Sequence, residues 1–174
     1  MRILFLLLCL ANIAVAVGMI WWMPDPMATH FGPDNQADDF MSPAGYVVFF
    51  SGLVVFFAGL FLCIPWLMRV LPVSAFNMPN RDFWMNQANR PRTLRRVEVY
   101  MDSLGIAMML LFLLLQWLTF HANRTDPPQL IMPIFWCGLA GFLAAMTVLT
   151  VRIFLSFRLP KKSGEEHDGH AQQP

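Results

Sequence analysis

The residues best suited to chemistry lie in one short polar stretch, 24–43, between two long apolar runs. This stretch joins one histidine, four aspartates and two phenylalanines more closely than any other part of the chain. Its candidate ligand-binding residues are His30, Phe31, Asp34, Asp38, Asp39 and Phe40. Carboxylates near an imidazole raise the pKa of histidine, so the cluster could respond to pH or hold a cation through its oxygens.

A second interpretation of the same residues stays open. The carboxylate spacing matches no metal-binding template closely, so we expect no metal and no cofactor. Solvated loop residues and capping groups would give the same residue types. Gly32-Pro33-Asp34-Asn35 is typical of a turn, and Ser42-Pro43 is typical of a helix start.

Four apolar runs must position this stretch, at about 3–23, 46–68, 104–120 and 130–155. Each is about 17 residues or longer, enough for a helix to cross a hydrocarbon core of about 30 Å. An open sheet cannot span there, because its edge N–H and C=O groups would have no partner. The chain is 57% hydrophobic and only 13% charged, whereas soluble domains are about a quarter charged. We therefore predict an all-α, four-helix transmembrane domain over residues 1–160, surrounded by a lipid bilayer.

The first run also resembles a cleavable signal peptide, with Ala14-Val15-Ala16 as the candidate cleavage site. It continues through Ile20-Trp21-Trp22-Met23, however, and paired tryptophans suit an interfacial anchor. We expect the run to be retained as a span.

The orientation follows from where the basic residues lie. The first loop has no lysine or arginine, and the third has only Arg124. Apart from Arg2, the second loop and the tail with its approach carry the rest: Arg69, Arg81, Arg90, Arg92, Arg95, Arg96, Arg152, Arg158, Lys161 and Lys162. This pattern places both termini and the basic loop 2 in the cytoplasm, and a structured loop 1 outside. The polar tail, 161–174, has no apolar face and is predicted to be disordered.

The second loop has its own candidate contacts. The candidates are Asn77 and Asn80, which belong to a predicted turn, and Arg81, Phe83 and Trp84, which follow it. Pro91 is suited to open a helix that runs into the third span, with Leu94, Val97, Met101 and Leu104 on one face. Arg92, Arg95 and Arg96 on its flank would meet anionic lipid.

Charges are expected only near span ends. Asp102 and Arg152 lie near inner ends, where a side chain can snorkel to water. A proton- or ion-coupled transporter usually has an ionisable group at depth, so this distribution disfavours that class.

Two segments carry a family resemblance. Pro24-Asp25-Pro26-Met27-Ala28-Thr29-His30-Phe31, with Gly32 to Ser42, resembles the loop after the first span of the SdpI/YhfL-like bacterial membrane proteins. Asn77-Met78-Pro79-Asn80-Arg81-Asp82-Phe83-Trp84 resembles their second loop. The sequence departs from the family at Asp38-Asp39-Phe40, which lacks a glycine, and at Pro43, where a lysine is common.

The resemblance implies a multi-pass protein of the bacterial inner membrane with an immunity or signalling role. Loop 1 would bind an extracytoplasmic peptide or small ligand, and loop 2 would meet a cytoplasmic regulator or membrane partner. We expect no enzyme, because the sequence has no metalloprotease motif and no phosphate-binding glycine loop. We also expect no direct contact with nucleic acid. The alternative is a small homo-oligomeric transporter or channel subunit, for which Gln116, Thr119, Thr147 and Thr150 are the only candidate lining residues.

Overall fold

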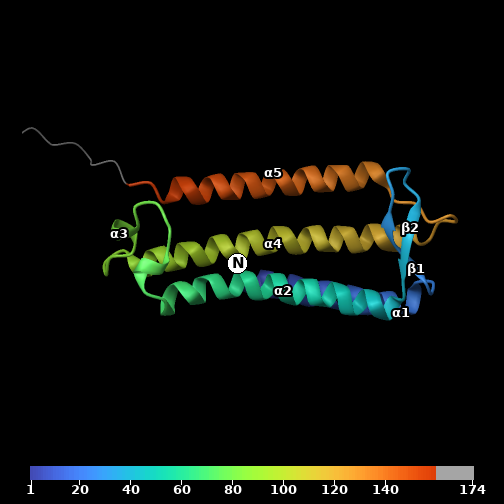
Figure 1. Cartoon of the computed structure of the whole chain (residues 1–174), viewed down its shortest axis with the longest axis horizontal. Coiled ribbons are helices and arrows are strands. Elements are labelled where there is room, and N and C mark those ends of the chain that lie inside the picture. The colour runs from blue at the N-terminus through green and yellow to red at the C-terminus, as the bar shows by residue number, and fades with distance from the viewer. Residues whose placement is uncertain (160–174) are drawn as a thin grey trace, which may run out of the picture.

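The computed structural model describes residues 1–159 and confirms the predicted all-α bundle of four long helices (Figure 1). The helices are α1 (Arg2–Trp22), α2 (Pro43–Val70), α4 (Arg90–Ala122) and α5 (Met132–Ser156). Shorter elements join them: β1 (Met27–Phe31), β2 (Ala37–Met41), the 3-10 helix η1 (Val73–Ala75) and α3 (Arg81–Trp84). All four long helices are long and apolar enough to cross a membrane. The predicted disordered tail, 161–174, lies outside the described residues.

The helix starts follow the local signals. The Ser42 hydroxyl accepts a hydrogen bond from the Gly45 N–H at 3.1 Å, and Pro43 occupies the first turn of α2. Pro91 lies in the first turn of α4, which runs without a break to Ala122, as predicted. Val97 and Leu104 on the predicted apolar face of α4 are buried.

Figure 1 shows the long helices side by side, with the two strands at one end of the bundle and α3 at the other. We call residues 23–42 and 123–131 the hairpin end. The basic end comprises residues 71–89, the first turns of α4 and the last turn of α5. Helices α1, α2 and α4 pack against one another, whereas α5 packs mainly against α4 and has no buried residue.

A close contact between α1 and α4 sets their spacing. Gly105 faces Phe5, and a Cβ atom placed on Gly105 would lie 2.6 Å from Phe5 Cε2. Glycine therefore lets the two backbones approach closely, as small residues do in membrane bundles. The fully buried Phe5 ring also packs edge-on against Phe61 of α2.

Polar groups inside the bundle were not predicted. Asp102 does not snorkel to water: it is buried, and Arg2 Nε donates a hydrogen bond to its Oδ1 at 2.7 Å. Asn12 and Gln116 are fully buried, and Gln116 Nε2 donates to Asn12 Oδ1 at 2.9 Å. These pairs form because α1 and α4 pack directly against each other in one register. The predicted four-span topology gives the two helices the same direction, but no local pattern encodes which helices pack together or in which register.

Candidate ligand site at the hairpin end

The polar stretch 24–43 contains the predicted turn and the predicted helix cap at Ser42, and its flanking segments pair as a β-hairpin, which was not predicted. Strands β1 and β2 pair antiparallel, with register irregularities on both sides of His30. The turn falls at the predicted residues: the Asn35 N–H donates to the Gly32 carbonyl at 3.0 Å. Asn35 has a φ of 65°, a left-handed conformation that asparagine tolerates well.

His30 and Asp38 form a pair across the two strands. The His30 Nδ1 and Asp38 Oδ1 atoms lie 2.5 Å apart, and both side chains are more than half exposed. The hydrogen bond to Asp38 raises the pKa of His30 above its ordinary 6.5, and the charges of Asp38 and Asp39 raise it further. Of the predicted cluster of His30, Asp34, Asp38 and Asp39, the structure therefore brings His30 and Asp38 into direct contact.

A cavity of about 770 Å³ lies beneath the hairpin, between α2, α4 and α5. Its walls are mostly apolar, and its rim is the hairpin. The wall residues are Tyr46, Phe49 and Phe50 of α2, Leu115, Leu118 and Thr119 of α4, and Leu130, Met132, Phe135 and Trp136 on or next to α5. The rim residues are Thr29, His30, Phe31, Gly32, Pro33, Asp39 and Met41. Ligand sites in proteins commonly have this size and this combination of apolar walls and a few polar groups.

The cavity wall contains the buried hydroxyl group of Tyr46. Tyr46 is only 4% exposed, and its Oη makes no hydrogen bond among residues 1–159. The neighbouring Thr119 hydroxyl donates to the Leu115 carbonyl at 2.9 Å, and its oxygen can still accept from Tyr46. Tyr46 therefore has one candidate partner in the protein, and a ligand oxygen at the cavity wall would be a second.

The predicted ligand-binding residues divide into two groups. His30, Phe31 and Asp39 line the cavity. Asp34, Asp38 and Phe40 do not: Asp34 accepts from the Gln36 N–H at 3.3 Å, Asp38 bonds His30, and Phe40 is 47% exposed. In the described part of the chain, no three histidine, cysteine, aspartate or glutamate side chains gather closely enough to hold a metal ion.

Residues distant in sequence fix the hairpin over the cavity. Asn123, just after α4, accepts from the Ala28 N–H at 2.7 Å and donates to the Ala28 carbonyl at 2.9 Å. The Leu130 N–H donates to Asn35 Oδ1 at 3.1 Å, and Gln36 pairs with Gln129. An asparagine directly after a helix is a common helix cap, so the sequence gives no indication that Asn123 bonds to the hairpin.

The predicted partner-contact residues at the basic end make different contacts. Asn80 Nδ2 and Trp84 Nε1 donate to the Phe157 carbonyl at 3.0 and 2.8 Å, and Arg96 Nη1 donates to the Ser156 carbonyl at 2.6 Å. These three side chains therefore cap the carbonyl groups at the C-terminal end of α5. The others, Asn77, Arg81, Phe83, Arg92 and Arg95, are exposed or half-buried at the surface.

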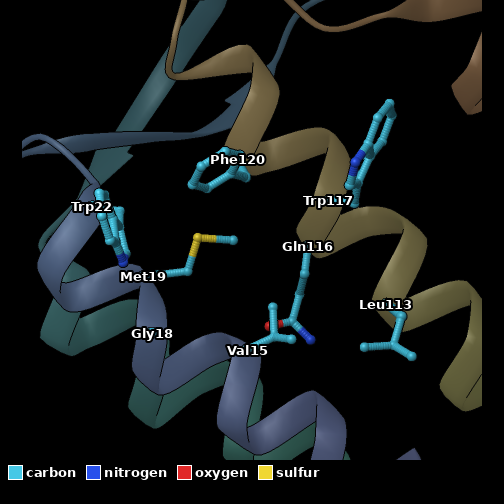
Figure 2. A pocket seen from close by; sticks show the side chains of 8 residues that line it. All are labelled: Val15, Gly18, Met19, Trp22, Leu113, Gln116, Trp117 and Phe120. Carbon is cyan, nitrogen blue, oxygen red and sulfur yellow. The ribbon is translucent and has the colours of Figure 1, made fainter.

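A second groove, of about 390 Å³, lies between α1 and α4 (Figure 2). Gln116 extends from α4 toward α1 there, and its Oε1 has no partner among the described residues. The other lining side chains are apolar: Val15, Met19, Trp22, Leu113, Trp117 and Phe120, with Gly18 between them. This groove contains none of the predicted ligand-binding or partner-contact residues, but it does contain Gln116, a candidate lining residue of the transporter alternative.

No protein-family model, curated protein or solved structure matches the chain. The resemblance to the SdpI/YhfL-like proteins stays a prediction that residues 24–42 and 77–84 carry. The function has to follow from the residues and the geometry of this molecule.

Proposed function

We propose that this chain is a non-enzymatic protein of a bacterial inner membrane that binds an extracytoplasmic amphiphile, most simply a cationic peptide. The cavity under the hairpin carries this proposal. Its aromatic and aliphatic walls would bury an apolar segment, while His30 and Asp39 at the rim would contact a polar one. The family resemblance, with its immunity or signalling role, points to the same kind of ligand.

The charge at the hairpin end favours a cationic ligand. Residues 23–42 and 123–131 contain five aspartates and one arginine, Arg124. The Arg124 guanidinium lies 4.8 Å from the centre of the Phe120 ring. A surface of one sign concentrates ligands of the opposite sign and speeds their association. Protonation of His30 would weaken this attraction, so binding is expected to strengthen as pH rises through its pKa.

The orientation supports a ligand that arrives from outside. Six arginines lie in residues 69–103, and only Arg124 lies in the two connections at the hairpin end. Positively charged loops stay in the cytoplasm, so the hairpin would face outward. Asn77, Arg81 and Phe83 would then be available to a cytoplasmic regulator.

The binding test uses the full chain in zwitterionic nanodiscs and a fluorescent lysine–leucine amphipathic peptide. Asp39→Asn and Tyr46→Phe each remove one polar contact, and each is expected to weaken binding about tenfold or less. Asp34→Asn is the matched control, because Asp34 lies in the same hairpin but does not line the cavity. Peptide affinity that is the same in all three variants and the unmodified chain would exclude the cavity as the site.

A cellular test separates binding from its consequence. Protection or signalling that disappears in His30→Ala at normal membrane levels would support the proposed role. Phe83→Ala is a better test of the basic end than Trp84→Ala, because Trp84 holds the end of α5. Solute flux above that of empty liposomes would instead favour the transporter or channel subunit.

A further inference from the structure

We propose that a pocket between α4 and α5 at the basic end binds the head group of an anionic phospholipid. The pocket measures about 550 Å³ and is lined by four arginines, Arg92, Arg95, Arg96 and Arg152. Tyr100 and Ser103 add hydroxyl groups, and Val99 and Leu149 add apolar surface. Basic pockets between transmembrane helices on the cytoplasmic side are suited to phosphate head groups.

Helix geometry brings the arginines together. Positions 92, 95 and 96 are three and four residues apart, so they share one face of α4. Arg152 comes from α5, whose last turns lie beside this face. The Tyr100 hydroxyl donates to the Arg152 carbonyl at 3.3 Å and so links the two helices at the pocket.

The positive charge of the pocket is not neutralised within residues 1–159. The nearby carboxylates are used elsewhere: Asp102 pairs with Arg2, Glu98 with Arg69, and Asp82 with Arg81. Arg96 is held in place by its bond to the Ser156 carbonyl, with its guanidinium 4.9 Å from the Trp84 ring centre. Arg92, Arg95 and Arg152 therefore remain for phosphate oxygens, which arginine binds through paired N–H donors.

The surface beyond the arginines favours a lipid over a soluble anion. The same face of α4 continues from Ser103 to Ala107, Leu110 and Leu114, and the facing part of α5 contains Gly138 and Gly141. These residues line an apolar groove of about 260 Å³ along the same α4–α5 seam. A head group at the arginines would place an acyl chain in this groove. Three available arginines favour a lipid with two phosphates, such as a diphosphatidylglycerol, over one with a single phosphate.

The test measures lipid binding to the purified full chain by native mass spectrometry in neutral detergent. Diphosphatidylglycerol, phosphatidylglycerol and phosphatidylcholine are compared, with glycerol phosphate as the soluble anion. The double variant Arg95→Gln/Arg152→Gln should weaken diphosphatidylglycerol binding about tenfold or more. Arg95→Lys/Arg152→Lys keeps the charge and should bind more tightly than the glutamine double variant but less tightly than the unmodified chain, which separates loss of charge from misfolding. Arg81→Gln is the matched control, since Arg81 lies at the same end but outside the pocket.

Two outcomes would overturn the proposal. One is equal affinity of the glutamine double variant and the unmodified chain for diphosphatidylglycerol. The other is glycerol phosphate binding as tightly as the lipid, which would make the pocket a soluble-anion site.

Discussion

The side-chain amide of Asn123 pairs with the backbone of Ala28 through two hydrogen bonds, of 2.7 and 2.9 Å. One bond uses the Ala28 N–H and the other its carbonyl, so Asn123 occupies the place that a neighbouring strand would take. Ala28 is fully buried in β1. This pair joins the hairpin, which forms the rim of the cavity, to the end of α4, which forms part of its wall.

Asn123→Ala should loosen the hairpin without unfolding the bundle. Two lost hydrogen bonds of about 1 kcal/mol each correspond to about a tenfold or larger increase in hairpin opening. Hydrogen exchange of the amides of residues 27–41 measures this opening. Asn77→Ala is the control, because Asn77 is an exposed asparagine at the opposite end. Unchanged exchange in Asn123→Ala would mean that the hairpin is held by other contacts.

The pH dependence of the hairpin follows from His30. Its pKa is raised in the fold, so the stabilisation by Asp38 is complete below the ordinary histidine value of 6.5 and is lost as pH rises through the raised pKa. Asp38→Asn removes the largest cause and should lower the pKa of His30. NMR titration of the His30 ring in both proteins measures the two midpoints, with Asp34→Asn as the control. Identical midpoints in Asp38→Asn and the unmodified chain would contradict the pair.

The Arg2–Asp102 pair predicts an asymmetric mutational result. Arg2→Ala leaves the buried Asp102 carboxylate without its partner and should destabilise the protein by about 2–4 kcal/mol. Arg2→Ala/Asp102→Ala removes both charges and should cost less than the single change. Thermal unfolding in detergent gives both values. A double variant less stable than Arg2→Ala would show that the burial of Asp102 does not depend on this pairing.

The contact of Phe5 with Gly105 predicts a steric effect at one glycine only. Gly105→Ala should cost about 1–3 kcal/mol, because its new methyl group would overlap the Phe5 ring. Gly59→Ala in α2 is the matched control, since no atom lies within 4 Å of the added methyl. Phe5→Leu should recover part of the stability of Gly105→Ala. Equal melting temperatures of the two alanine variants would contradict the close α1–α4 contact.

The helices were predictable because their signals are local. Apolar length identified the four spans, and Ser42, Pro43 and Pro91 marked where α2 and α4 begin. The hairpin was not predicted, because it depends on contacts between residues far apart in the sequence. Met27–Phe31 and Ala37–Met41 lack a regular alternation of apolar and polar residues, and Asn123, far along the chain, holds the hairpin in place.

The site was only partly predictable for the same reason. His30, Phe31 and Asp39 were identified from composition, and they do line the cavity. Tyr46 was assigned to the start of an apolar run, since nothing local shows that its hydroxyl is buried in a cavity wall. Asp102 was assigned to water, because its pairing with Arg2 depends on the packing of α1 against α4 and on their register.

The most direct test of the central claim, that the cavity opens to the outside, is cysteine labelling in intact cells. Single cysteines replace Gln36 at the hairpin end and Gln87 at the basic end, both exposed, in a chain lacking Cys9, Cys63 and Cys137. The proposal predicts that a membrane-impermeant maleimide labels position 36 in intact cells and position 87 only after permeabilisation. Labelling of position 87 but not 36 in intact cells would place the hairpin in the cytoplasm and contradict an extracytoplasmic ligand.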